Sequence, residues 1–376
     1  MKKKLMVFAA LLCAIVCAFA FVACNKDEGG SGETAQSVVG EKVTAEQWAA
    51  ALKEDNFTQG KVVVTNTQTG DIRTGENDYA RGTATITTTY TIAGDKQYSK
   101  TQYAATGDAE LVTLASQMGT QEEYSWKIDD GIFIQYAQDY EDRTKWEFEV
   151  YRQGLVEYEL DEVLECADMY DEFVYDDAKK GYVPKEDSEY FEDEALTLKF
   201  KDNKLVAVID EYEVTRNEKT TKYTNAYVIT YGTQSVTLPT MPESPMAGTW
   251  ELKTLKIYHE EHGYGGTYGV GDEIEGLTGG EKLKAEDVTI VINSDGTASF
   301  VFMKGTPMEE SGNGAWEWWT ESGTFYSTKL PSDMNGSMGI SYVVDDDDEE
   351  SEEKVLSFTV NTNGYSIGIK LVKKAA

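Results

Sequence analysis

Residues 82–92 read GTATITTTYTI and alternate in the period of a β-strand. Because successive side chains of a strand point to opposite faces, and because threonine, isoleucine and tyrosine favour strands, this stretch predicts a strand within a sheet. Comparable stretches occur on both sides of it, with turn residues such as Gly94-Asp95 between them. They are residues 61–65, 96–103, 122–128 and 132–137. An antiparallel meander is the simplest topology for such a series.

Two helices are predicted in the same region. Thr44 is a favourable N-cap and Gln47 completes a capping box, with Trp48 as the first large apolar residue behind them. A second helix is predicted from Leu155 to Phe173, because the apolar residues of this stretch recur at helical spacing. An amphipathic helix in this position needs a sheet or another helix to cover its apolar face.

More strands are predicted after the second helix, at residues 181–183, 195–200, 204–211 and 223–231. The resulting order is a helix with an aromatic anchor, a strand meander, an amphipathic helix and closing hairpins, and it resembles the LolA-type lipoprotein-carrier fold. The resemblance implies an incomplete antiparallel barrel over residues 43–238, covered by helices, whose concave face can hold acyl chains. It rests on architecture, so no functional residue of that family is assigned. The residues themselves leave open whether such a curved sheet packs solid or keeps an apolar groove.

A second module follows a short linker. Residues 239–246 are rich in proline, which suits a semi-rigid connection. Gly248-Thr249-Trp250 then resembles the start of lipocalin-like bacterial barrels, in which the tryptophan closes one end. Strand-like stretches on either side of Asn293-Ser294-Asp295-Gly296 predict a hairpin. We therefore predict a mainly β (α+β) fold, with an antiparallel half-barrel covered by helices followed by a small lipocalin-like β-barrel over residues 247–376.

The start of the chain carries a targeting pattern. Three lysines precede an uncharged apolar run from Leu5 to Ala23, which is typical of a secretory signal peptide. Phe21-Val22-Ala23-Cys24 resembles the lipobox of bacterial lipoproteins, which implies that residues 1–23 are removed and that Cys24 receives acyl chains such as palmitate. The alternative is an uncleaved signal anchor. Both place the remaining chain outside the cytoplasm and tied to a membrane, with the polar residues 24–42 as a flexible tether.

Acidic residues dominate the composition. The chain holds 67 Asp plus Glu against 34 Lys plus Arg, a formal net charge of −33. Such a surface repels the phosphates of nucleic acids, so the composition argues against a nucleic-acid partner. We interpret the charge as a source of solubility outside the cell. No pattern in the sequence indicates a cofactor.

Candidate chemical sites are few. The only histidines, His259 and His262, are three residues apart, whereas the helical zinc-protease motif needs four, so no metal site is predicted. The acidic run from Asp345 to Glu353 indicates a solvated loop rather than a calcium site. Apart from the lipidation site Cys24, Cys166 is the one cysteine beyond the leader, and we interpret it as a buried, inert thiol. Without a catalytic constellation, we expect no enzymatic activity.

Trp316, Trp318 and Trp319 form the densest aromatic cluster. Trp316 and Trp318 share a strand face and are predicted to be core, whereas Trp319 points the other way and is the candidate ligand contact. The leading hypothesis is non-catalytic binding or carriage of a lipid or other apolar small molecule at the cell envelope. The alternative is a structural, adhesion or protein-interaction module with solid cores, and a third interpretation is a carbohydrate-active protein that uses exposed aromatic residues.

Overall fold

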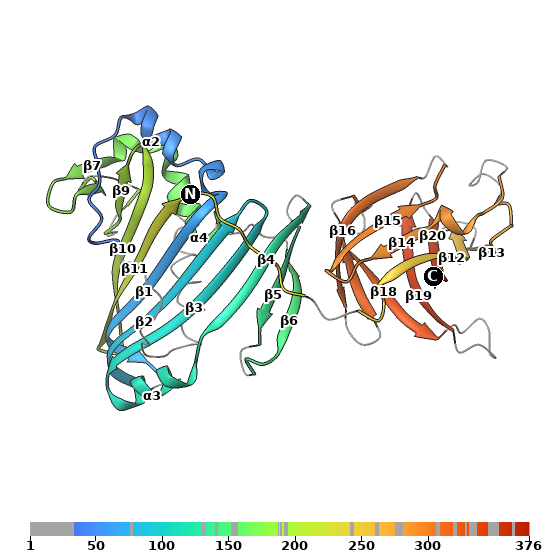
Figure 1. Cartoon of the computed structure of the whole chain (residues 1–376), viewed down its shortest axis with the longest axis horizontal. Coiled ribbons are helices and arrows are strands. Elements are labelled where there is room, and N and C mark those ends of the chain that lie inside the picture. The colour runs from blue at the N-terminus through green and yellow to red at the C-terminus, as the bar shows by residue number, and fades with distance from the viewer. Residues whose placement is uncertain are drawn as a thin grey trace. The chain divides into compact units, whose positions relative to one another are not determined.

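The computed structural model describes residues 34–75, 78–129, 132–139, 142–151, 157–186, 188, 190–191, 195–240, 244–259, 263–274, 281–305, 309–318, 322–327, 329–330, 337–344, 353–362 and 365–375. The first module is an 11-stranded antiparallel sheet in the order β6-β5-β4-β3-β2-β1-β11-β10-β9-β8-β7 (Figure 1). Its strands are β1 (Gln59–Arg73), β2 (Tyr79–Ala93), β3 (Lys96–Gly107), β4 (Gln121–Asp129), β5 (Ile132–Gln138), β6 (Trp146–Tyr151), β7 (Phe173–Asp176), β8 (Gly181–Pro184), β9 (Thr197–Lys201), β10 (Lys204–Arg216) and β11 (Lys219–Tyr231).

The sheet consists of two meanders, β1 to β6 and β7 to β11, which join where β1 pairs with β11. The predicted meander is therefore confirmed, and the threonine-rich stretch forms β2, which pairs with β1 along its whole length. Because directly paired residues point to the same side of a sheet, the register divides the side chains between two faces. We call the face that carries Val62 and Val64 the helical face and the opposite one the outer face.

One end of the helical face is covered by α2 (Ala45–Ala51), as Figure 1 shows. Thr44 caps this helix, and its capping box with Gln47 is formed as predicted. Trp48 is fully buried, and its ring lies 4.9 Å from that of Phe200, measured between centroids. The same apolar cluster includes side chains of β1, β9, β10 and β11, so α2 is fixed to the sheet by burial.

The mid-chain helix is shorter than predicted. α4 (Glu157–Glu165) ends at Glu165, and the chain continues through two 3₁₀ helices, η2 (Cys166–Asp168) and η3 (Tyr170–Glu172), before β7. The Cys166 carbonyl accepts the Met169 N–H at 2.9 Å and the Trp48 Nε1–H at 2.8 Å. This tighter hydrogen bond replaces the α-helical pattern, so the prediction of a helix as far as Phe173 is wrong at its end. Its predicted start at Leu155 lies outside the described residues.

The other end of the helical face is covered by α3 (Ala109–Gln117), which the sequence did not lead us to predict. Leu111 and Ala115 are fully buried there and pack in one cluster with Ile72 of β1. Gly82 of β2 lies beneath the helix, where a Cβ atom would be only 2.7 Å from Leu111 Cδ2. Glycine is required at this position because a Cβ atom would also lie 2.1 Å from the backbone carbonyl oxygen of Thr106 on β3.

Part of the outer face is covered by residues 34–43. Lys199 of β9 is only 2% exposed, and its Nζ donates hydrogen bonds to the carbonyls of Ala35, Gln36 and Val38 at 2.9, 3.1 and 2.8 Å. Burial lowers the pKa of this amine. Residues 34–42, which we expected to be a flexible tether, are therefore held on the sheet, whereas residues 24–33 lie outside the described residues.

The second module is a closed barrel of eight strands, in which β12 and β14 to β20 pair in chain order and β20 returns to β12. β13 pairs with the second half of β12, outside this closed order. The strands are β12 (Gly248–His259), β13 (Gly263–Gly269), β14 (Thr289–Ile292), β15 (Thr297–Phe302), β16 (Glu310–Trp318), β17 (Ser322–Tyr326), β18 (Ser337–Val344), β19 (Lys354–Thr362) and β20 (Tyr365–Lys373). Trp250 is buried in the barrel core, where its Nε1–H donates to the Met246 carbonyl at 2.7 Å.

By internal contacts the chain forms two compact units. The first comprises Met1–Tyr124, Ala137–Trp146 and Val156–Thr237, and the second comprises Ser125–Tyr136, Glu147–Leu155 and Leu238–Ala376. The second unit thus includes parts of β4, β5 and β6 besides the barrel. Among the described residues, none of the helices has the length and apolar character needed to cross a membrane.

Replacement of Lys199 by Met is expected to loosen residues 34–43. The variant loses three hydrogen bonds from a charged donor, and the carbonyls of Ala35, Gln36 and Val38 lose the ammonium group that they accept from. We therefore expect the free energy of unfolding to fall by about 2–4 kcal/mol. Urea unfolding measures this loss, and hydrogen exchange locates it in residues 34–43. Lys201→Met is the matched control, since Lys201 is on the same strand but exposed. Equal effects of the two substitutions would contradict the assigned role of Lys199.

Candidate functional site

The middle of the helical face is polar on β1, β10 and β11, whereas the β2 residues paired with Asn66 and Gln68 are Ile86 and Ala84. Along β1, Val62 and Val64 lie in the apolar cluster with α2, and Ile72 lies in the cluster with α3. The residues between them on the same face are Asn66, Gln68 and a glycine. The register places polar and aromatic side chains of β10 and β11 beside them. We call this group the polar strip, and its members are Asn66, Gln68, Asp210, Tyr212, Tyr223 and Asn225.

Asp210 is the one ionisable carboxyl group of the strip. It is partly buried, and its carboxylate accepts a hydrogen bond from Asn225 Nδ2 at 3.1 Å. Burial raises the pKa of the Asp210 carboxyl; the Asn225 hydrogen bond opposes this shift, and the nearby Glu211 carboxylate adds to it. Within the described part of the chain, no lysine or arginine forms an ion pair with Asp210. Among the described residues, the hydrogen-bond partner of the Asp210 carboxylate is therefore the Asn225 amide.

The two rows of the strip differ in chemistry. Asp210, Asn225 and Asn66 stand side by side across β10, β11 and β1. In the next row towards α3, the Tyr212 and Tyr223 rings are stacked, with centroids 4.8 Å apart and planes 5° from parallel. Such an array can bind a polar or charged group through hydrogen bonds and aromatic edges.

The strip begins where β10 loses its pairing with β9. The pairing of β9 with β10 ends at Thr197↔Ile209, so Asp210 is the first residue of β10 beyond it. From that point β10 has a paired neighbour only on the β11 side within the described part of the chain.

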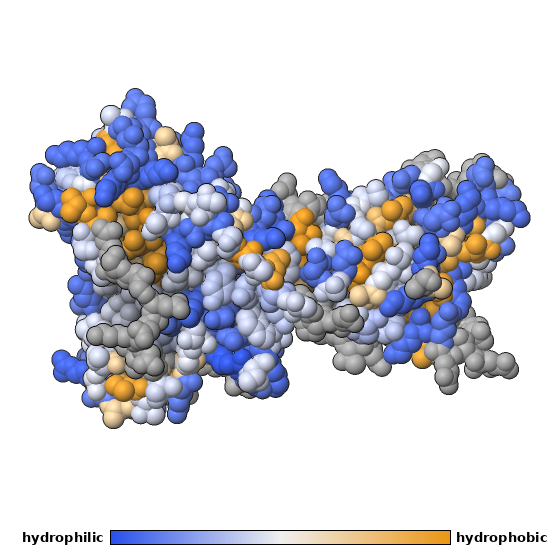
Figure 2. Space-filling view, viewed as in Figure 1, coloured by the Kyte–Doolittle hydropathy of each residue, from blue (hydrophilic) through white to orange (hydrophobic). Residues whose placement is uncertain are grey.

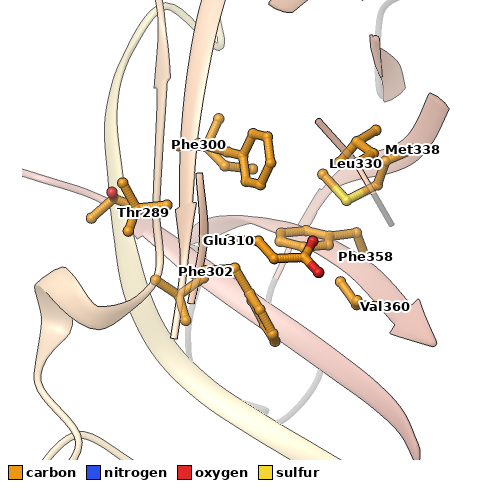
Figure 3. A pocket seen from close by; sticks show the side chains of 11 residues that line it. Thr289, Phe300, Phe302, Glu310, Leu330, Met338, Phe358 and Val360 are labelled. Carbon is orange, nitrogen blue, oxygen red and sulfur yellow. The ribbon is translucent and has the colours of Figure 1, made fainter. Parts of the chain in front are cut away.

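The barrel interior, in contrast, is filled. Side chains from all eight strands of the closed order form one cluster, which includes Trp250, Trp316 and Phe325 at 1%, 0% and 0% exposure. A pocket of about 20 Å³ remains between Phe300, Met338 and neighbouring side chains of β14 to β19. Figure 3 shows the Glu310 carboxylate among these apolar residues. This volume holds about one water molecule, which is far too little for a lipid.

The structure describes some of the residues singled out from the sequence, and others lie outside the described residues. Trp316 is core as predicted, and Cys166 is buried as predicted, at 3% exposure. His259 ends β12, and its backbone pairs with Gly263 of β13 across a hairpin. Outside the described residues lie the side chain of Trp318 and the whole of Cys24, Trp319, His262 and 345–352. The structure therefore does not test the lipidation site or the candidate ligand contact.

Sequence reasoning missed the polar strip altogether. Its members lie on three strands, and Asn66 meets Asn225 only because the first strand of the sheet pairs with the last. A local signal did exist, since the helical-face positions of β1 change from Val62 and Val64 to Asn66 and Gln68 within one strand. Among the described residues, no group of His, Cys, Asp or Glu side chains is arranged to hold a metal ion.

The visible surface carries no broad apolar area. Figure 2 shows hydrophilic residues over most of the face in view, with apolar residues in separate patches. The exposed large apolar side chains of the described part are dispersed over both units, for example Val39, Val174, Val270 and Val344. Single exposed apolar residues of this kind are normal on soluble proteins and mark no ligand site.

Comparisons with known proteins leave the family open. No protein-family model matches the chain, and no curated protein sequence matches it significantly. Among solved structures, a double mutant of transferrin binding protein B from Haemophilus parasuis aligns at 6% identity and a TM-score of 0.18, covering 84% of this chain and 76% of that one. The isotype 1 transferrin binding protein B from serogroup B Neisseria meningitidis aligns at 9% identity and a TM-score of 0.19, covering 84% and 77%. TM-scores this low do not establish a common fold.

Asp210→Asn is expected to stabilise the protein at neutral pH. Since the folded pKa is raised, the stability linked to this group is present below the unfolded carboxyl pKa of about 3.9 and is lost as the pH rises through the folded value. The asparagine keeps the shape and removes this loss, so the two proteins should converge in stability as the pH falls towards about 4. Urea unfolding across this pH range measures the difference. A variant less stable than the wild type at pH 7 would contradict the assignment.

Proposed function

We propose that this chain is a lipid-anchored, extracytoplasmic protein that binds a protein partner through its open sheet and performs no catalysis. The observation that carries the proposal is the polar strip, which lies on the helical face between two apolar clusters. A protein surface meets such a strip with hydrogen bonds and charge, whereas the filled barrel offers no comparable site. This favours the interaction module over the other functions considered from the sequence.

The polar groups of the strip argue against lipid carriage. The resemblance to the LolA-type fold implied a face that holds acyl chains, and an acyl chain needs an apolar lining. Here the middle of that face presents a carboxylate and three carboxamides, whose transfer into contact with hydrocarbon without partners is costly. With a barrel pocket of about 20 Å³, neither module supports the binding of a lipid or another apolar small molecule.

The anchor sets how far the sheet can stand from the membrane. If Cys24 carries the acyl chains, the residues between it and Thr34 span at most about 35 Å even when fully extended. From Thr34 onward the chain lies on the outer face, where Lys199 holds it. The first module would then act close to the lipid surface, and its partner would be a neighbouring envelope protein or a protein that reaches the cell surface.

A photoreactive amino acid placed at two adjacent positions of β1 tests the proposal. Gln68 lies on the polar strip, and Thr67 points to the outer face. We expect a discrete protein adduct on living cells from position 68 and none from position 67, because only one face carries the site. Adducts of equal yield at both positions, or a stoichiometric lipid in an organic extract of the purified protein, would count against protein binding.

Cys24→Ser is expected to abolish the lipid anchor. The variant lacks the thiol that receives the acyl chains, so incorporation of an alkyne-labelled palmitate analogue should fall to background. The protein should also move from the membrane fraction to the soluble fraction, because without acyl chains only the leader can hold it. Cys166→Ser is the control and should keep both the label and the membrane location. Membrane retention of Cys24→Ser without label would indicate an uncleaved signal anchor instead.

A further inference from the structure

We propose that Asp210 and its neighbours in the polar strip receive a basic side chain, an arginine or lysine, of the protein partner. The inference rests on the proposed function and names the chemistry by which the partner is recognised. The site consists of Asp210, Asn225 and Asn66 in one row, with the Tyr212 and Tyr223 pair in the next.

The first step of the inference is the contrast between two neighbouring carboxylates. Glu211 follows Asp210 on β10 and points to the outer face, where Lys222 lies 3.5 Å away as its cation. Asp210 points to the helical face, and within the described part of the chain its hydrogen-bond partner is Asn225 alone. Within the described residues, the chain therefore supplies a cation to Glu211 and none to Asp210.

The second step concerns the groups around the carboxylate. Within the described residues, no side-chain hydrogen bond joins Asn66 or Gln68 to another residue, so their carboxamide oxygens are available to a donor. Guanidinium and ammonium groups carry only donors, and such donors match a carboxylate flanked by amide oxygens. The tyrosine pair provides an aromatic wall beside which an aliphatic stem or a planar guanidinium packs.

The third step is the long-range charge. With 67 acidic against 34 basic residues, the protein attracts cationic surfaces before contact. Diffuse attraction alone does not select a site, because any exposed acid contributes to it. Selection requires a carboxylate whose charge gains a partner only on binding. Of the two adjacent acids on β10, Asp210 meets that condition.

The test compares two substitutions that each remove one negative charge. Binding of a hexa-arginine peptide to the mature chain, kept soluble by Cys24→Ser, is measured by calorimetry at about 0.15 M salt. We expect Asp210→Asn to weaken binding roughly 30-fold or more, because a partly desolvated charge pair is lost. Glu211→Gln should change the affinity less than about threefold, since it removes a charge on the other face that is already paired with Lys222 and is 34% exposed.

Every result of the binding experiment either supports or overturns the inference. Equal losses from the two variants would show diffuse attraction only, and no binding by the parent protein would also overturn the inference. Preference for a neutral oligosaccharide over hexa-arginine would reassign the strip to sugars. Urea unfolding confirms that Asp210→Asn is folded, so that loss of binding is not loss of structure. Crosslinking at position 68 is a separate measurement. A protein adduct there would support protein binding even if the hexa-arginine experiment contradicts recognition of a basic side chain.

Discussion

The buried indole of Trp48 fixes the architecture of the first module. Its Nε1–H donates to the Cys166 carbonyl at 2.8 Å, and its ring contacts Phe173 and Phe200 with centroids 5.0 and 4.9 Å away. A buried indole N–H without a partner costs roughly 1–3 kcal/mol, so the 3₁₀ turn at Cys166 has to stay where the indole meets it. One side chain thus joins α2, the end of α4 and the β7 to β9 hairpins into one apolar cluster.

This attachment confines the helices to one end of long strands. β1 and β2 have fifteen residues each, whereas α2 has seven and α4 nine, so the helices near Trp48 cover only part of the strand length. α3 covers the opposite end through Leu111 and Ala115. On β2 the residues paired with Gln68 and Asn66 are Ala84 and Ile86, which pack in the cluster with α3. On β1, β10 and β11 the middle of the helical face is left to residues that belong to neither cluster. Those residues are polar because apolar side chains without a covering helix would gain nothing from their position.

Patterns with a period within one element were predictable from the sequence. The alternation of residues 82–92 gave the strand β2, and Thr44 with Gln47 gave the start of α2. The predicted end of the mid-chain helix was wrong because the Cys166 carbonyl bonds to Trp48, which lies 118 residues away in the sequence. α3 was missed although Asp108 precedes an amphipathic stretch, since that helix is only nine residues long. The polar strip could not be predicted, because its rows depend on the pairing of β1 with β11.

The placement of polar groups distinguishes the two modules. The barrel directs apolar side chains inward from every strand and closes its sheet, which removes open strand edges and leaves a solid core. The first module keeps its sheet open and holds Asp210 partly buried with an amide as its described partner. A leucine or valine at position 210 would extend the apolar cluster. A partly buried carboxylate whose described partner is an amide instead lowers the stability of the folded state. A group that destabilises its own fold is best understood through what it binds, which supports our proposal that the open sheet rather than the barrel recognises the partner.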